Sequence, residues 1–300
     1  MKFLKERNDF SYDFAIYGLG FESRSVALLD SDTTEEAIKV AIGYSVNTDV
    51  LNYPDNKAAF VASNCKVIEG DDDSVFEKFE SVFSRLNFET PVNVQLDITV
   101  MSRYRLASIL CRLIKKLPSD SIVSVVYSRS SFVEPPSDST PIRTIGELSD
   151  ELIGDVGDLS LPTCAIFGLG YEPDKALGVS NYLDSNIVLA YVPKSDEERF
   201  ETCVLENNED FLSQLASTNI ASYSVDMPYS TYVDLKSLII SLKEITRPIL
   251  IPLGPKILSA IGAVIGLELQ IPVWRVSSDH EERPVERPAS GNIIRFDLSI

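Results

Sequence analysis

AIYGLGFE at residues 15–22 recurs as AIFGLGYE at residues 165–172. Six of the eight positions are identical, and the other two exchange one aromatic residue for another. Each copy is a short apolar run that ends at Gly-Leu-Gly, a pattern typical of a buried β-strand followed by a tight turn. Two such copies half a chain apart predict that the protein is built from two related α/β units.

A second pair of segments extends the expected repeat. VQLDITVMSRYRL at residues 94–106 aligns without a gap on YSVDMPYSTYVDL at residues 223–235, which places Asp97 on Asp226. The two motifs are closer together in the second half, so we expect that half to have lost a segment resembling the acidic stretch at 69–73. The sequence thus predicts an internal duplication whose copies have diverged.

Strand-length apolar runs alternate with helix-length stretches in both halves. The expected strands are 14–17, 38–46, 92–97, 122–127, 164–167, 187–192, 221–226, 249–253, 273–276 and 293–298. Continuous apolar strands between helices are typical of parallel sheets covered on both faces. The predicted fold class is therefore α/β, with two tandem Rossmann-like three-layer units whose sheets are mainly parallel.

The expected division of the chain follows the composition around its middle. Residues 1–135 form the first predicted unit and residues 161–300 the second, diverged one. Residues 136–160 are acidic and contain no strand-length apolar run, which favours a linker. Residues 278–292 are polar and contain proline, so we expect a surface loop there.

The charge balance excludes some classes of partner. The 300 residues include 27 Lys and Arg but 45 Asp and Glu, a net charge of −18. Such a charge repels the phosphates of duplex nucleic acid and anionic membrane surfaces, so direct binding to either is not expected. No apolar run approaches the roughly 18 to 20 residues that cross a bilayer. With no secretory signal at the N-terminus, we expect a cytoplasmic protein.

Cysteine and histidine usage argues against several kinds of site. The four cysteines include no C-x-x-C pair, which favours reduced structural thiols over disulfides or metal ligands. They are Cys65, Cys111, Cys164 and Cys203. His280 is the only histidine, so a His-rich zinc site and a Ser-His-Asp triad are not expected. The sequence predicts neither a metal nor a cofactor.

The turn after the first strand is the first candidate for ligand binding, because parallel sheets bind ligands beyond the carboxyl ends of their strands. In GLGFESR, Gly18 and Gly20 allow a tight turn whose amides can hold an anion, and Arg24 adds a positive charge. The third glycine of the dinucleotide fingerprint is missing. Glu22 would repel a phosphate unless it binds a ribose hydroxyl or caps the helix. The alternative is a turn that needs glycine only for its backbone.

A second candidate follows the strand at 92–97. Asp97 closes this strand, Thr99 and Ser102 follow in the loop, and Arg103 and Arg105 begin a helix. Arginine at a helix start opposes the helix dipole, which indicates an anionic partner. That partner is a ligand phosphate or a carboxylate of the protein, and the alternative is a capped helix with an internal Asp97–Arg103 salt bridge. The second copy of this loop keeps Asp226 but has Pro228, Tyr232 and Asp234 in place of Thr99, Arg103 and Arg105, so the first copy is the better candidate.

Two further strand ends belong to the second half. PLGPK at residues 252–256 places Gly254 and Lys256 at a helix start, an arrangement that suits a phosphate. The alternative is a plain turn with an exposed lysine. At VWRVSSDH, residues 273–280, we interpret Trp274 as a core residue rather than a platform for a base.

Two of these motifs together resemble a known group of proteins. GFExRS at residues 20–25 and DITxMxR at residues 97–103 are similar to motifs of uncharacterised Rossmann-like proteins encoded in bacterial anti-phage defence operons. The resemblance covers these two short motifs and carries over no catalytic residues. It implies a cytoplasmic component of an antiviral defence system.

Two classes of function fit these observations. The first is a binding protein or complex subunit with a pocket for a nucleotide or another phosphorylated small molecule. Its expected ligand-binding residues are Gly18, Gly20, Arg24, Thr99, Ser102, Arg103, Gly254 and Lys256. The alternative is a nucleotide-directed hydrolase or glycosidase that uses Glu22 or Asp97 as nucleophile or base. The diverged second copy favours binding, and the acidic surface predicts a further protein subunit as partner.

Overall fold

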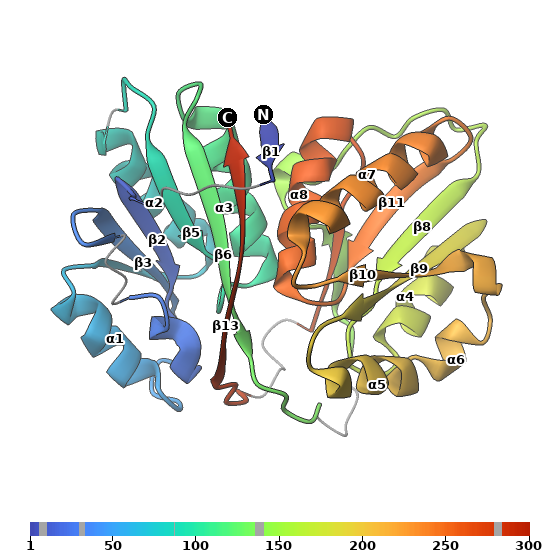
Figure 1. Ribbon diagram of the computed structural model, residues 1–300, viewed down its shortest axis with the longest axis horizontal. Coiled ribbons are helices and arrows are strands. Elements are labelled where there is room, and N and C mark those ends of the chain that lie inside the picture. Colours follow the sequence, from blue (N-terminus) through green and yellow to red (C-terminus); the bar gives the residue numbers. More distant parts are fainter. Residues whose placement is uncertain (6–10, 30–33, 87, 136–140, 279–283) are drawn as a thin grey trace. The chain divides into compact units, whose positions relative to one another are not determined.

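The structure is a computed structural model that describes residues 1–5, 11–29, 34–86, 88–135, 141–278 and 284–300 (Figure 1). The chain divides into two compact units. Unit 1 consists of Met1–Ser131 together with Arg283–Ile300, and unit 2 consists of Phe132–Glu282. The chain therefore enters the second unit once and returns to the first for its last segment.

Unit 1 is built on a seven-stranded sheet. Its strands are β1 (Lys2–Leu4), β2 (Phe14–Gly18), β3 (Ile38–Tyr44), β4 (Lys66–Gly70), β5 (Asn93–Asp97), β6 (Ile122–Ser130) and β13 (Ala289–Ser299). Their order is β1-β13-β6-β5-β2-β3-β4. Strands β2 to β6 are parallel to one another, whereas β13 runs antiparallel to both β6 and β1. The parallel strands follow the Rossmann order 3-2-1-4-5, so the topological switch point lies between β2 and β5.

Helices cover both faces of this sheet. They are α1 (Tyr53–Ala62), α2 (Asp72–Leu86) and α3 (Arg103–Lys116), with a short 3-10 helix η1 (Ser23–Val26) after β2. Successive residues of β2 point to opposite faces. Phe14 packs against Phe83 of α2, and Tyr17 packs against Phe60 of α1. The unit thus has the three layers that the apolar strands predicted.

Unit 2 contains a fully parallel sheet of four strands (Figure 1). The strands are β8 (Thr163–Gly168), β9 (Ile187–Lys194), β10 (Ile220–Ser224) and β11 (Arg247–Pro252), in the order β10-β9-β8-β11. The helices are α4 (Lys175–Leu183), α5 (Glu198–Asn207), α6 (Glu209–Leu212), α7 (Pro228–Lys243) and α8 (Lys256–Leu269). Side chains of α4, α5 and α6 belong to the same hydrophobic core cluster as Phe167 of β8, whereas α7 and α8 contact β11. The mixed α/β class expected from the sequence is confirmed.

The two Gly-Leu-Gly motifs occupy the same place in their sheets. Both sheets contain four parallel strands in the order 3-2-1-4, and each motif follows strand 1 of that order. Strand 1 is β2 in unit 1 and β8 in unit 2. The Leu19 amide donates to the carbonyl of Ile42 at 2.8 Å, and the Leu169 amide donates to that of Tyr191 at 2.9 Å. In both cases the acceptor lies on the next strand of the sheet. Duplication as the origin of this likeness stays a prediction.

The second expected correspondence was wrong. Asp97 ends β5, which lies beside β2, whereas Asp226 follows β10, which lies at the sheet edge beside β9. By position β5 corresponds to β11, and β10 with α7 stands where unit 1 has β4 with α2. Unit 2 therefore has a strand and a helix at this position, although the first turn of α7 contains no acidic residue. Both strands read as apolar runs that end in aspartate, and this local pattern does not encode a place in the sheet.

The division into units differs from the expected one at both boundaries. Residues 144–147 form β7 (Thr144–Glu147), which pairs with β12 (Trp274–Ser277), and Leu148 and Leu152 are fully buried. Residues 141–160 thus belong to unit 2 instead of forming a linker, and residues 136–140 lie outside the described part. β13 belongs to unit 1 because its alternating apolar residues Ile294, Phe296 and Leu298 complete the sheet beside β6.

Candidate functional site

The switch point of unit 1 carries the site residues predicted in the first half of the chain. β2 and β5 pair only as far as Ile16 and Leu96, whereas β2 stays paired with β3 through Gly18 and Ile42. Beyond that point β2 continues into residues 20–25, here called the GFES turn, and β5 continues into the loop 98–102. The candidate side chains of the first half lie on these two connections.

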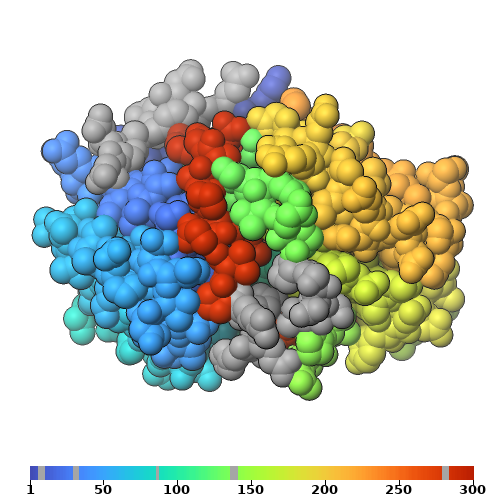
Figure 2. Space-filling view, turned by 90° about the horizontal axis from the view of Figure 1, so that it is seen from below, coloured from blue at the N-terminus to red at the C-terminus, as the bar shows by residue number. Residues whose placement is uncertain are grey.

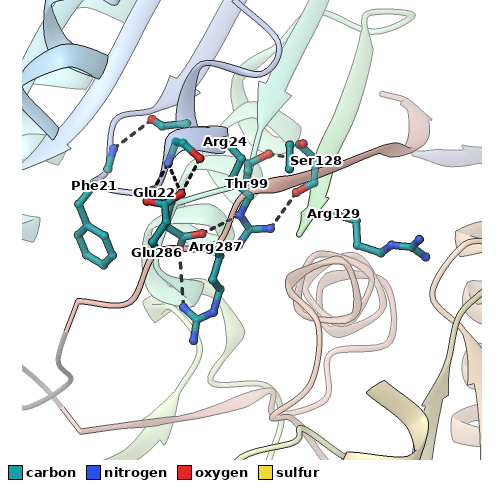
Figure 3. A network of polar contacts seen from close by, with 12 residues as sticks. Phe21, Glu22, Arg24, Thr99, Ser128, Arg129, Glu286 and Arg287 are labelled. Atoms are coloured by element: carbon teal, nitrogen blue, oxygen red, sulfur yellow. Dashed lines mark hydrogen bonds and ion pairs between the residues drawn. The ribbon is translucent and has the colours of Figure 1, made fainter. Parts of the chain in front are cut away.

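A buried ion pair forms the centre of the site (Figure 3). Arg24 Nε lies 2.6 Å from Glu22 Oε2, and Arg24 Nη1 donates to the carbonyl of Ser128 at 2.8 Å. The guanidinium also lies 5.6 Å from the centre of the Tyr127 ring. Burial acts to lower the pKa of Arg24, but its interactions with Tyr127 and Glu22 raise that pKa overall. Arg24 therefore stays charged and ties the GFES turn to β6.

Side chains that the sequence did not single out build the turn itself. Ser25 Oγ donates to the Gly18 carbonyl at 2.9 Å and accepts the Gly20 amide at 3.2 Å. Asn56 Nδ2 donates to the carbonyls of Gly20 and Glu22 at 2.8 and 2.9 Å. Ser25 stands inside the quoted motif, whereas Asn56 lies on α1 and no local signal marks it. The turn is thus held from two elements.

The two glycines of the turn accommodate the neighbouring loop. A Cβ on Gly18 would lie 3.0 Å from the side chains of Val100 and Met101, and one on Gly20 would lie 3.1 Å from Val100. Val100 and Met101 are buried. Loop packing alone therefore accounts for both glycines, which is the alternative to a phosphate-binding role.

The loop after β5 is fixed by its own polar side chains. Asp97 Oδ1 accepts the Thr99 amide at 2.9 Å, and Thr99 Oγ1 accepts the Ser128 amide at 2.9 Å. Ser102 Oγ accepts the Arg105 amide at 3.1 Å and so caps α3. Arg103 is the first residue of α3 and is partly buried. Arg24 and Thr99 therefore both bond the backbone of Ser128, and Glu22 joins them through its ion pair with Arg24. Ser102 caps α3 instead.

Arg105 is a structural residue. Its side chain is 2% exposed, and its Nε lies 2.6 Å from Asp72 Oδ1. Nη1 and Nη2 donate to the carbonyls of Gly43 and Gly70 at 2.6 and 2.8 Å, and the guanidinium lies 3.9 Å from the centre of the Tyr44 ring. An arginine at the start of α3 thus has its anionic partner inside the protein.

A carboxylate from the far end of the sequence occupies the GFES turn. Glu286 Oε1 accepts the Ser23 amide at 3.0 Å and also the Ser23 hydroxyl, and Glu286 Oε2 accepts Asn52 Nδ2 at 2.6 Å. Arg287 Nη1 lies 3.7 Å from Glu22 Oε1. Figure 2 shows the chain after residue 283 (red) against N-terminal residues (blue). The sequence predicted only a surface loop here, and no local signal marks either residue.

The predicted residues of the second half belong to unit 2. The Gly254 amide donates to the Gly168 carbonyl at 2.9 Å, and a Cβ on Gly254 would lie 2.3 Å from the Leu169 carbonyl oxygen. Lys256 is the first residue of α8 and is partly buried. The structure thus divides the expected ligand-binding residues between two units of the chain.

The remaining sequence interpretations have mixed outcomes. Trp274 packs against the hydrophobic core of unit 2, as interpreted. All four cysteines are buried, and none forms a disulfide. His280 lies outside the described residues.

Within the described ranges, no group of three or more His, Cys, Asp or Glu side chains is placed to hold a metal ion. No helix in the part of the chain that the structure describes is long and apolar enough to cross a membrane.

Comparisons with known proteins add little. No family model matches the chain, and no curated protein matches it. A similar solved structure is the cytoplasmic domain of a prokaryotic cation chloride cotransporter, at 8% identity and a TM-score of 0.26. The match covers 90% of this chain and 97% of that chain. A TM-score this low supports no conclusion about fold or function.

Proposed function

We propose that the protein is a binding protein or complex subunit that takes a nucleotide or another phosphorylated ligand at the switch point of unit 1. One observation carries the proposal: the Glu286 carboxylate is held by three donor groups of Ser23 and Asn52 beyond the carboxyl end of β2. Sheets with this strand order bind their ligands at such a place. Phosphate oxygens accept the same amide and hydroxyl donors as a carboxylate does.

The ion pairs of the site support binding over catalysis. Glu22 Oε2 lies 2.6 Å from Arg24, and its Oε1 lies 3.7 Å from Arg287. Asp97 Oδ1 holds the amide of Thr99. Both carboxylates thus have structural partners, whereas a hydrolase or glycosidase would need one of them as its nucleophile or base. The paired charge of Glu22 also reduces its repulsion of a phosphate.

Further parts of the proposal rest on the sequence. The motifs at 20–25 and 97–103 support a role in antiviral defence. The net charge of −18 supports a basic protein as partner. The repeated motif at 15–22 and 165–172 supports origin by internal duplication.

Calorimetric titration tests this function. AMP, ADP, ATP and inorganic phosphate are titrated into the wild-type protein, into Ser23→Ala and into the control Ser237→Ala. Ser237 lies on α7, where its hydroxyl donates to the Val233 carbonyl. We expect Ser23→Ala to weaken binding by about 10-fold or more, as a lost hydrogen bond to a charged group does. The control should match the wild type.

Two results would contradict the proposal. Equal affinities of Glu286→Ala and the double variant Ser23→Ala/Glu286→Ala would place the ligand elsewhere, because neither variant keeps the carboxylate that shares the Ser23 hydroxyl. Absence of binding to the wild type and to a folded variant without the Glu286 carboxylate would exclude a phosphate site. Chromatography of the recovered nucleotide separates the two function classes, because a binding protein returns the nucleotide intact and a hydrolase does not.

A further inference from the structure

We propose that Glu286 is an internal ligand, and that a terminal phosphate group binds to this site by displacing the Glu286 carboxylate from Ser23 and Asn52. The inference rests on the proposed function. It adds two points. The group that is recognised is a phosphate monoester or free phosphate, and the Glu286 carboxylate competes with it for the same donors.

The contacts of Glu286 are those of a bound anion. Its two carboxylate oxygens accept three donors from two elements, the Ser23 amide and hydroxyl on the GFES turn and the Asn52 side chain before α1. One contact that does not involve Glu286 joins the two elements, because the Asn52 backbone amide donates to the Phe21 carbonyl at 3.1 Å. The backbones that carry the donors therefore stay together when the anion that occupies the site is exchanged.

Charge favours replacement of the carboxylate by a phosphate. Glu22 and Glu286 carry two negative charges, and Arg24 and Arg287 carry two positive ones. Without the Glu286 carboxylate the remaining three side chains have a net charge of +1. That positive charge attracts an anionic group such as a phosphate, whereas it does not attract a neutral ligand. Glu286 is partly exposed, so its released carboxylate is hydrated by solvent and not left in an apolar environment.

The chain around Glu286 can release it without loss of the sheet. β13 pairs with β6 in continuous register from Ile293 to Ser299, and the register shifts between Ala289 and Ile293. The 284–288 segment precedes this shift and is also held by the Ser131 amide, which donates to the Pro288 carbonyl at 2.9 Å. Rotation of the Glu286 side chain therefore frees the donors while β13 stays in place.

Removal of the internal carboxylate tests the inference. Inorganic phosphate and AMP are titrated by calorimetry into wild type, Glu286→Ala and Glu286→Gln near neutral pH. We expect Glu286→Ala to bind at least about 10-fold more tightly, because a tethered group competes at an effective concentration in the millimolar range or above. Glu286→Gln, which keeps the size and loses the charge, should lie between the two. Ser23→Ala added to Glu286→Ala should abolish the gain.

A matched control separates competition from net charge. Glu244 is exposed at the end of α7, and Glu244→Ala removes the same charge from the protein in unit 2. An equal gain from Glu244→Ala would overturn the inference. Equal affinities of wild type and both Glu286 variants would also overturn it, while the proposed function would stand. If none of them binds phosphate or AMP, with circular dichroism showing folded proteins, the proposed function itself is wrong. If Glu286→Ala fails to fold, Glu286→Gln decides.

Discussion

Arg24 Nε lies 2.6 Å from the Oε2 of Glu22, two residues away, and both side chains are 7% exposed or less. The pair forms across the first turn of η1, so both partners come from one short segment. Arg24 also reaches the Ser128 carbonyl, which joins that segment to β6. The ion pair therefore keeps Glu22 in place and leaves its second oxygen directed to Arg287.

Removal of Arg24 should destabilise the protein strongly. Arg24→Ala leaves Glu22 buried without this partner, and breaking a buried pair costs about 3 to 5 kcal/mol. Arg24→Lys should recover only part, because an ammonium lacks the fork that bonds Glu22 and Ser128 together. The control is Arg199→Ala, whose pair with Glu197 is exposed to solvent and should contribute little to stability. Urea unfolding measures the difference, and equal losses in Arg24→Ala and the control would contradict the role of the pair.

Gly254 should not tolerate a side chain. A Cβ at this position would lie 2.3 Å from the Leu169 carbonyl oxygen, which is backbone and cannot rotate away. Gly254→Ala should lower the free energy of unfolding by about 1 to 3 kcal/mol or more, the cost of overpacking. Gly146→Ala is the matched control, because nothing lies within 4 Å of its added Cβ. Thermal and urea unfolding measure both. A Gly254→Ala variant as stable as Gly146→Ala would contradict the close approach.

Ionisation of Tyr17 should weaken the fold at high pH. Burial raises the pKa of Tyr17 to about 12, above the value of about 10 in an unfolded chain. The folded state therefore keeps a proton that the unfolded state releases between these values. The stabilising effect is complete below pH 10 and is lost as the pH rises to about 12.

Tyr17→Phe tests this pH dependence. The variant loses the hydrogen bond from the Tyr17 hydroxyl to Thr34, so it should be less stable at pH 8. Its urea midpoint should fall less steeply between about pH 10 and 12 than that of the wild type. Tyr182→Phe, at an exposed position, should follow the wild-type curve. Parallel curves for Tyr17→Phe and the wild type would show that Tyr17 does not contribute.

The cysteines should be unreactive in the folded protein. Burial raises the pKa of Cys65 and of Cys164 to about 11, which leaves little thiolate at neutral pH. All four cysteine residues are buried as well. We expect slow reaction with Ellman's reagent in buffer and rapid reaction of all four thiols in urea. A rapid native phase that accounts for one or more thiols would contradict this burial.

The sequence by itself determined the local elements and part of the candidate site. AIYGLGFE reads as an apolar strand followed by a glycine turn, and both features depend on neighbouring residues only, so β2 and β8 were predictable. Ser102 before an amphipathic stretch indicated the start of α3, where it serves as the cap. The residues of the GFES turn and of the loop after β5 were predictable because strand ends in parallel sheets lie at one edge.

Only the tertiary structure decided the strand order and the occupant of the site. β5 and β10 read alike, yet one lies in the centre of a sheet and the other at an edge. β13 pairs with β6 because its apolar face fits a free strand edge, and alternation along a strand does not encode its neighbour. The contact between Ser23 and Glu286 joins residues 263 positions apart. Such a pair depends on how the whole chain packs, so the local pattern around either residue does not reveal it.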